Sequence, residues 1–136
     1  MLGDIGPGES DTNRYDRSIA DTACKWLTDI SNKPSGRPWV LYLGFVAPHF
    51  PLVVPQKYFD LYPVELLPPR KLNPLDGYKR HPWIERMDKF KPHDAALTAE
   101  ERLRAVAAYF GLCSFVDAQI GKILETLAET GLDSKT

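Results

Sequence analysis

Apolar side chains recur at helical spacing in the first quarter of the chain. With Trp26 they form one stripe along a helix, at spacings of four, four and three residues: Ile19, Ala23, Leu27 and Ile30. Ser10, Asp11 or Thr12 is a suitable N-cap, and turn-forming residues at 32–36 end the pattern. The pattern predicts a helix from about residues 10–12 to about residue 30, with this stripe buried.

A continuous apolar run follows at residues 39–46 (WVLYLGFV). It is shorter than a typical helix and lacks alternation of apolar and polar residues, which favours a strand buried on both faces. Such strands belong to parallel sheets with helices on either side. A helix followed by a buried strand is half of an α/β repeat, so the predicted fold class is α/β.

A second long helix is predicted near the end of the chain. Thr98 and Glu101 form a capping box, and Gly131 is a natural stop. Gly111 and Gly121 each lower helix stability by about 1 kcal/mol relative to alanine, so a break at either fits the pattern. The apolar positions of this helix are Leu103, Val106, Phe110, Cys113, Val116, Ile120, Ile123, Leu124 and Leu127.

The middle of the chain is rich in proline. Most of the 12 prolines fall between Pro34 and Pro92, which predicts loops. Residues 55–62 read as a short helix with proline in its first turn. Residues 63–97 read as an irregular loop or insertion, unusually long for a compact domain. We expect it to cover a substrate entrance or to pack on protein outside this chain. The length of 136 residues is that of about one domain.

The charge and hydrophobicity of the chain argue against binding to nucleic acid and against a membrane-spanning helix. The formal net charge is -1, from 17 basic and 18 acidic residues that are well mixed, so no basic surface for nucleic acid is expected. No apolar run approaches the roughly 20 residues of a membrane helix, and no signal peptide opens the chain; the localisation is unknown. Cys24 and Cys113 lie within helical apolar patterns and are predicted to be small buried hydrophobic residues, although a disulfide between them is compatible with the sequence.

His49 is the main candidate for chemistry. It follows the predicted strand and lies between Pro48 and Pro51, and ligands of open α/β sheets bind beyond the carboxyl ends of strands. An imidazole there can donate a proton to a leaving oxygen or bind an anionic group; the alternative is a histidine that only closes a tight turn. Substrate contacts of Lys57 and of His81 and His93 at a pocket rim are further hypotheses, beside the alternative that these side chains are merely solvated.

Two stretches resemble sulfatases of the alkaline-phosphatase-like superfamily. Residues 39–52 (WVLYLGFVAPHFPL) match an apolar strand that runs into a P-H-x-P turn, followed by a short helix. Residues 109–124 are similar to a helix of the form Y-(Y/F)-x(5)-(V/I)-D-x-Q-(I/V)-G-x-(I/L)-L. The matches occur in the expected order and together span most of residues 15–131.

The resemblance implies a fold, an activity and a set of cofactors. Residues 1–136 would be a single incomplete domain, the middle segment of a larger sulfatase catalytic domain. This segment would be part of a three-layer αβα, alkaline-phosphatase-like fold, with one buried strand, two main helices and a long loop. The parent protein would hydrolyse small-molecule sulfate esters with a bound divalent cation, usually calcium, and a formylglycine nucleophile. The histidine that matches His49 lines the active site near the sulfate and assists the leaving group, whereas Asp117, Gln119 and Gly121 match positions that we interpret as structural.

The sequence departs from the family in the residues that carry the reaction. Neither Cys24 nor Cys113 begins the C/S-x-P/A-x-R motif from which formylglycine is made, and the chain contains no Asp-Asp, Asp-His or Asp-Asn pair for the metal. No metal ligand is therefore assigned. Sulfate ester cleavage needs a nucleophile and positive charge on the nonbridging oxygens as well as a proton donor. We expect the chain to be an inactive interior fragment on its own.

The sequence is compatible with two other functions. One is a fragment of a phosphonate monoester or phosphodiester hydrolase of the same superfamily, which shares the strand and the P-H-x-P turn. The other is a non-catalytic helical binding module, against which the strand at 39–46 argues because it needs neighbouring strands. An isolated strand of this kind also predicts self-association through its exposed edges.

Overall fold

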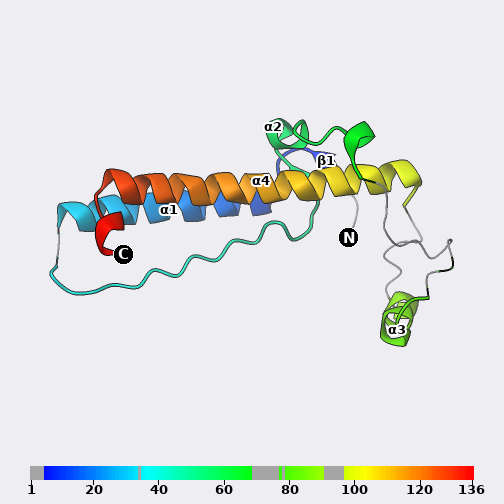
Figure 1. The fold of residues 1–136 in the computed structure, drawn as a ribbon, viewed down its shortest axis with the longest axis horizontal. Coiled ribbons are helices and arrows are strands. Elements are labelled where there is room, and N and C mark those ends of the chain that lie inside the picture. The colour runs from blue at the N-terminus through cyan, green and yellow to red at the C-terminus, as the bar shows by residue number, and fades with distance from the viewer. Residues whose placement is uncertain (1–4, 34, 69–76, 78, 91–96) are drawn as a thin grey trace.

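Two long helices lie side by side and run in the same direction (Figure 1). The structure, a computed structural model, describes residues 5–33, 35–68, 77, 79–90 and 97–136. Helix α1 spans Asp11–Asn32 and helix α4 spans Ala99–Glu129. Both predicted helices are confirmed, and α4 continues through Gly111 and Gly121 without a break.

The helix ends follow their local sequence signals. The Ser10 hydroxyl accepts a hydrogen bond from the Asn13 N–H at 3.1 Å, which satisfies one free donor at the start of α1. At the start of α4 the Glu101 N–H donates to Thr98 Oγ1 (3.1 Å) and the Thr98 N–H donates to Glu101 Oε2 (2.7 Å). Gly131 follows the helix with φ of 70°, a conformation that glycine adopts without steric cost. The predicted caps and stop are thus confirmed.

The apolar run at 39–46 is extended, but it forms no β-ladder with any described residue. It returns along the two helices in the opposite direction, from the end of α1 towards the start of α4 (Figure 1). Odd-numbered side chains are partly buried, and Trp26 of α1 meets Trp39 edge-on with 5.2 Å between ring centroids. Val40 and Tyr42 point away, with 95% and 89% of their surface exposed. The prediction of burial on both faces is therefore wrong for this chain, because nothing among its described residues covers the second face.

A different pair of segments makes a small parallel sheet. Strand β1 (Gly6–Pro7) pairs with β2 (Val53–Val54), and the ladder is extended by hydrogen bonds from the Gly6 N–H to the Leu52 carbonyl and from the Gly8 N–H to the Val54 carbonyl. Helix and parallel strand together support the α/β class. Neither strand was predicted, since two residues are too few to show a periodic pattern.

The core forms where α4 meets β2 and α2 (Gln56–Phe59). Its buried members are Ala47, Val54, Ala108, Leu112 and Phe115. Small residues on the buried face of α4 let neighbouring segments approach closely. The fully or nearly buried residues of α4 are Ala107, Ala108, Gly111, Leu112, Phe115 and Gln119. Several of the apolar residues that the sequence places in this helix are exposed: Leu103, Val106, Cys113, Ile120 and Leu124.

The two cysteines differ in environment. Cys113 is exposed, so its predicted burial is wrong, because it lies off the face of α4 that contacts the core. Cys24 is half-buried between α1 and α4, and its thiol lies 3.7 Å from the Lys122 carbonyl oxygen. Both are free thiols.

The proline-rich middle contains short helices. A 3-10 turn, η1, spans Val64–Leu66, and helix α3 spans Pro82–Phe90; the sequence reading of 63–97 as irregular missed α3. Helix α3 stands apart from the paired long helices (Figure 1), with Trp83 and Phe90 largely exposed. A second 3-10 turn, η3, spans Asp133–Lys135 after α4.

Helix α4 has the length and apolar composition of a helix that could cross a membrane. The core helices of soluble proteins satisfy the same criterion, and α4 packs against α1, α2 and both short strands.

Candidate functional site

His49 lies in a turn that begins where the extended segment ends. The His49 N–H donates to the Val46 carbonyl at 3.0 Å, which closes the turn. Pro48 and Pro51 flank the histidine, and the peptide bonds that precede both prolines are cis. The turn then leads into β2 and α2, so His49 lies between the extended segment and the core.

The hydrogen bond of the His49 ring settles its neutral tautomer. Nδ1 lies 2.9 Å from the Phe50 carbonyl oxygen; because a carbonyl only accepts, Nδ1 carries the hydrogen. The ring packs on the Phe50 ring with 4.0 Å between centroids. The side chain is exposed, and no described residue pairs with Nε2. In the protonated ring, Nε2–H is thus available to donate a proton.

Two polar residues of α1, Asn13 and Asp16, hold the ends of this turn; we call the pair the α1 clamp. Both are fully buried. The Asp16 carboxylate accepts one hydrogen bond from the Val46 N–H and one from the Ala47 N–H, each at 2.9 Å. The Asn13 amide Nδ2 donates to the Val53 carbonyl at 3.0 Å.

Sequence reasoning missed the α1 clamp, although a signal was present. Spacings of three, four, three and four residues place two polar and three apolar side chains on one buried face: Asn13, Asp16, Ala20, Ala23 and Leu27. Polar residues in phase with a buried stripe are not solvated. They need hydrogen-bond partners inside the protein.

Lys57 and His81 lie on elements remote from each other. The Lys57 ammonium, on α2, lies 4.6 Å from the centroid of the Tyr58 ring, within cation–π range. His81 precedes α3, where its Nδ1 accepts a hydrogen bond from the Trp83 N–H at 3.2 Å and so caps that helix. Helix α3 stands apart from α2 (Figure 1), and no described contact joins either residue to His49. His93 lies outside the described residues.

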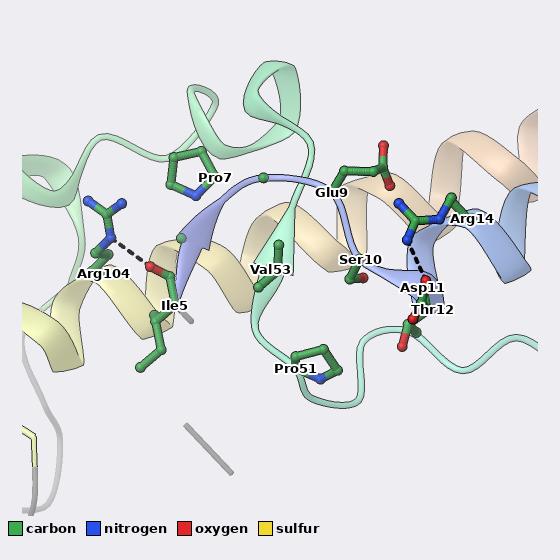
Figure 2. Close-up of a pocket in the computed structure, with 12 residues that line it drawn as sticks. Ile5, Pro7, Glu9, Ser10, Asp11, Thr12, Arg14, Pro51, Val53 and Arg104 are labelled. Atoms are coloured by element: carbon green, nitrogen blue, oxygen red, sulfur yellow. Dashed lines mark hydrogen bonds and ion pairs between the residues drawn. The ribbon is translucent and has the colours of Figure 1, made fainter. Parts of the chain in front are cut away.

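A separate open cleft of about 830 Å³ lies beside β1 and the first turn of α1. Figure 2 shows its two guanidinium groups directed at the chain itself: Arg104 donates from Nε to the Ile5 carbonyl (2.7 Å), and Arg14 pairs with Asp11. Pro51 lines the cleft but His49 does not. Arg14 is paired with a carboxylate, whereas Arg104 donates to a neutral carbonyl that does not neutralise its charge.

The described residues do not fit a metal centre. Nowhere in the described ranges do three His, Cys, Asp or Glu side chains gather. Asp117 is exposed on α4, and Gln119 donates from its side chain to the Phe115 carbonyl of its own helix. The described residues therefore offer no set of side chains that would hold a catalytic cation.

Comparison with known proteins identifies the family. The chain is 36% identical over 126 residues to a sulfatase of Formosa agariphila (88% of the chain, 23% of that protein) and 33% identical over 122 residues to a choline-sulfatase of Rhizobium meliloti (85% and 23%). It is also 28% identical over 141 aligned positions to a multifunctional alkaline phosphatase superfamily protein of Trinickia caryophylli (92% and 27%). The chain spans about a quarter of the length of these curated relatives. The Sulfatase family model matches residues 4–136, nearly the whole chain. The chain belongs to the sulfatase family.

Proposed function

We propose that this chain is part of the catalytic domain of a sulfate ester hydrolase, in which His49 donates a proton to the leaving oxygen. One observation carries the proposal. The family match includes the turn of His49, where the imidazole is exposed and the bond from Nδ1 to Phe50 leaves Nε2 for a substrate. Membership of a family of hydrolases argues against a helical binding module without catalytic ancestry.

In this proposal the extended segment 39–46 is a strand of a larger sheet in a three-layer αβα, alkaline-phosphatase-like domain. Val40 and Tyr42 are exposed on one side of this segment, and its backbone forms no β-ladder with any described residue. Both features fit a strand whose neighbours belong to the rest of a longer protein. That remainder would supply the formylglycine nucleophile and the divalent cation, usually calcium. Without them the 136-residue chain is inactive, because a proton donor alone performs only one of the tasks that the reaction requires.

The substrate would be a small-molecule sulfate ester. When its S–O bond breaks, the leaving oxygen gains negative charge, and a proton from Nε2–H neutralises that charge. This protonation accelerates the reaction most for an alkyl sulfate, whose leaving alkoxide is strongly basic. It accelerates the reaction least for an aryl sulfate with a weakly basic leaving group. Contacts of Lys57 and His81 with the substrate remain predictions.

The test compares the longer protein, expressed from the whole reading frame that contains this chain, with the 136-residue chain. We expect turnover of 4-nitrophenyl sulfate and of an alkyl sulfate by the longer protein only. His49→Ala should lower kcat on the alkyl sulfate by about 10²–10⁴-fold, the usual contribution of general acid catalysis. Unchanged kcat in that variant would remove the role of His49, and turnover by the short chain would refute its inactivity.

A second candidate is a phosphonate monoester or phosphodiester hydrolase of the same superfamily. The similarity to the Trinickia caryophylli protein favours it, although that identity is lower than those to the two sulfatases. Bis(4-nitrophenyl) phosphate and a phosphonate monoester, assayed beside the two sulfates, distinguish the candidates. A higher kcat/KM on the phosphorus esters would select the second.

A further inference from the structure

The α1 clamp is linked to the candidate proton donor through consecutive hydrogen bonds. The Val46 N–H donates to Asp16, and the Val46 carbonyl accepts from the His49 N–H at 3.0 Å. His49 in turn directs Nδ1–H to the Phe50 carbonyl. Val46 is therefore bonded both to Asp16 and to the backbone of His49, so a shift of Asp16 would move the backbone that carries the imidazole.

The clamp also fixes the turn from its other end. Asn13 lies one helical turn before Asp16 on the same face of α1, and its amide holds the Val53 carbonyl. The backbone is thus bound at 46 and 47 before the histidine and at 53 after it, by side chains of one rigid helix. A turn held at both ends leaves His49 little freedom to move.

Asp16 and Asn13 satisfy backbone groups of the turn, and their hydrogen bonds also fix its direction relative to α1. A buried carboxylate is costly unless hydrogen bonds replace its hydration, and aspartate is a weak helix former at the position of Asp16, in the second turn of α1. The buried Oδ1 of Asn13 has no partner in the part of the chain that the structure describes, which adds a further cost. Apolar side chains at these positions would leave the N–H groups of Val46 and of the buried Ala47 without their acceptor, and they could not orient those N–H groups.

We propose that Asp16 is a positioning residue for the His49 imidazole, with Asn13 as its support at the far end of the turn. The inference rests on the proposed function, since it presumes that His49 donates a proton to the leaving group. Asp16 itself does not touch the substrate. It sets the place of the group that does, and misplacement of a catalytic group by about 1 Å can cost on the order of 10²-fold in rate.

The test uses Asp16→Asn in the longer protein. This change keeps the size of the side chain but replaces one acceptor oxygen with an NH2 group, which faces a backbone N–H with a second donor. We expect kcat on an alkyl sulfate to fall by about 10- to 100-fold, and kcat on 4-nitrophenyl sulfate by less than about threefold because its leaving group needs little protonation. Asp21→Asn is the matched control, since it makes the same substitution at an exposed position of α1 and should leave both rates unchanged.

A double-mutant cycle separates positioning from general damage. In the His49→Ala background, Asp16→Asn should change neither rate by more than about twofold, because the group that it positions is gone. Equal losses on both substrates, or the same loss with and without His49, would overturn the positioning role. If His49→Ala alone leaves both rates unchanged, the proposed function of His49 fails instead, so the two failures are distinguishable.

A second variant covers the case in which Asp16→Asn does not fold. Asn13→Ala keeps both bonds to Asp16 and releases only the Val53 carbonyl. Like Asp16→Asn, it should lower kcat on the alkyl sulfate more than kcat on 4-nitrophenyl sulfate, but by a smaller factor. A loss that is equal for the two substrates in this variant would also contradict the proposal.

Discussion

Gly111 of α4 lies against the backbone of Tyr58, where a Cβ atom on the glycine would come within 3.1 Å of the Tyr58 carbonyl oxygen. The same Cβ would lie 3.2 Å from Cγ1 of the buried Val54. Such contacts are tight, and one of the two neighbours is backbone. The absence of a side chain at 111 is therefore what allows α2 and β2 to pack on α4.

Gly111→Ala is expected to destabilise the chain. Overpacking costs about 1–3 kcal/mol, which outweighs the helix-propensity gain of about 1 kcal/mol for alanine over glycine. The net decrease in the free energy of unfolding should be up to about 2 kcal/mol. Urea unfolding followed by circular dichroism measures it.

Gly121→Ala is the matched control in the same helix. Nothing lies within 4 Å of a Cβ at 121, so only the propensity gain applies, and stability should rise by about 0.5–1 kcal/mol. If both variants are stabilised equally, the close packing of α2 on α4 is wrong.

The capping box at Thr98 makes the stability of α4 depend on pH. The Thr98 backbone N–H, and then its side chain, bond to the Glu101 carboxylate and hold its pKa below the ordinary value of 4.5. A lowered folded pKa means that this stabilisation is present above pH 4.5 and is lost as the pH falls through the folded pKa. Between about pH 5 and pH 3, the free energy of unfolding should therefore fall less steeply in Glu101→Gln than in the unchanged chain.

Thr98→Ala tests the other half of the same cap. It should lower the free energy of unfolding by about 1 kcal/mol at neutral pH, as loss of an N-cap usually does. If the free energy of unfolding depends on pH in the same way in Glu101→Gln and in the unchanged chain, the Glu101 carboxylate does not bond to the cap in solution.

Local signals predicted the helices well, and the reason is physical. Ser10, Thr98 and Gly131 act on backbone groups within a few residues, so they could be recognised without knowledge of the rest of the fold. The buried face of α4 could not be recognised in this way. Residues such as Ala108 and Gly111 are buried by the approach of Tyr58, which lies about 50 positions away in the chain.

The candidate site was predicted only in part. His49 was found from its flanking prolines and from the resemblance to sulfatases, whereas its supports lie more than 30 residues earlier, in α1. The pairing of Asp16 with the N–H groups of Val46 and Ala47 is a tertiary contact. No pattern near His49 reports it.

Asp21→Asn should have only a small effect on stability. The Lys122 ammonium of α4 donates a hydrogen bond to the Asp21 carboxylate of α1, which raises the pKa of Lys122. With a raised folded pKa, the stabilisation is complete below the ordinary lysine value of 10.5 and is lost as the pH rises through the folded pKa. Both side chains are more than half exposed, so the loss at neutral pH should be below about 1 kcal/mol.

The salt dependence of stability tests whether Asp21 and Lys122 form a solvent-exposed ion pair. The difference in unfolding free energy between Asp21→Asn and the unchanged chain should shrink towards zero in about 1 M salt, where the Debye length is about 3 Å. A loss of several kcal/mol that persists in high salt would mean that the pair lies in a far less solvated interface between α1 and α4.

The uncovered side of the extended segment predicts self-association of the 136-residue chain. Val40 and Tyr42 are exposed beside backbone groups that form no β-ladder with any described residue, and such edges pair with other chains. Sedimentation velocity over a range of concentrations should show oligomers. The double variant Val40→Lys, Tyr42→Lys should be monomeric, because like charges oppose pairing while the partly buried faces of Leu41 and Leu43 stay against the helices. Lysines at the exposed Leu103 and Val106 of α4 are the matched control: if they abolish the oligomers and the strand variants do not, α4 is the associating surface and the strand edge is not.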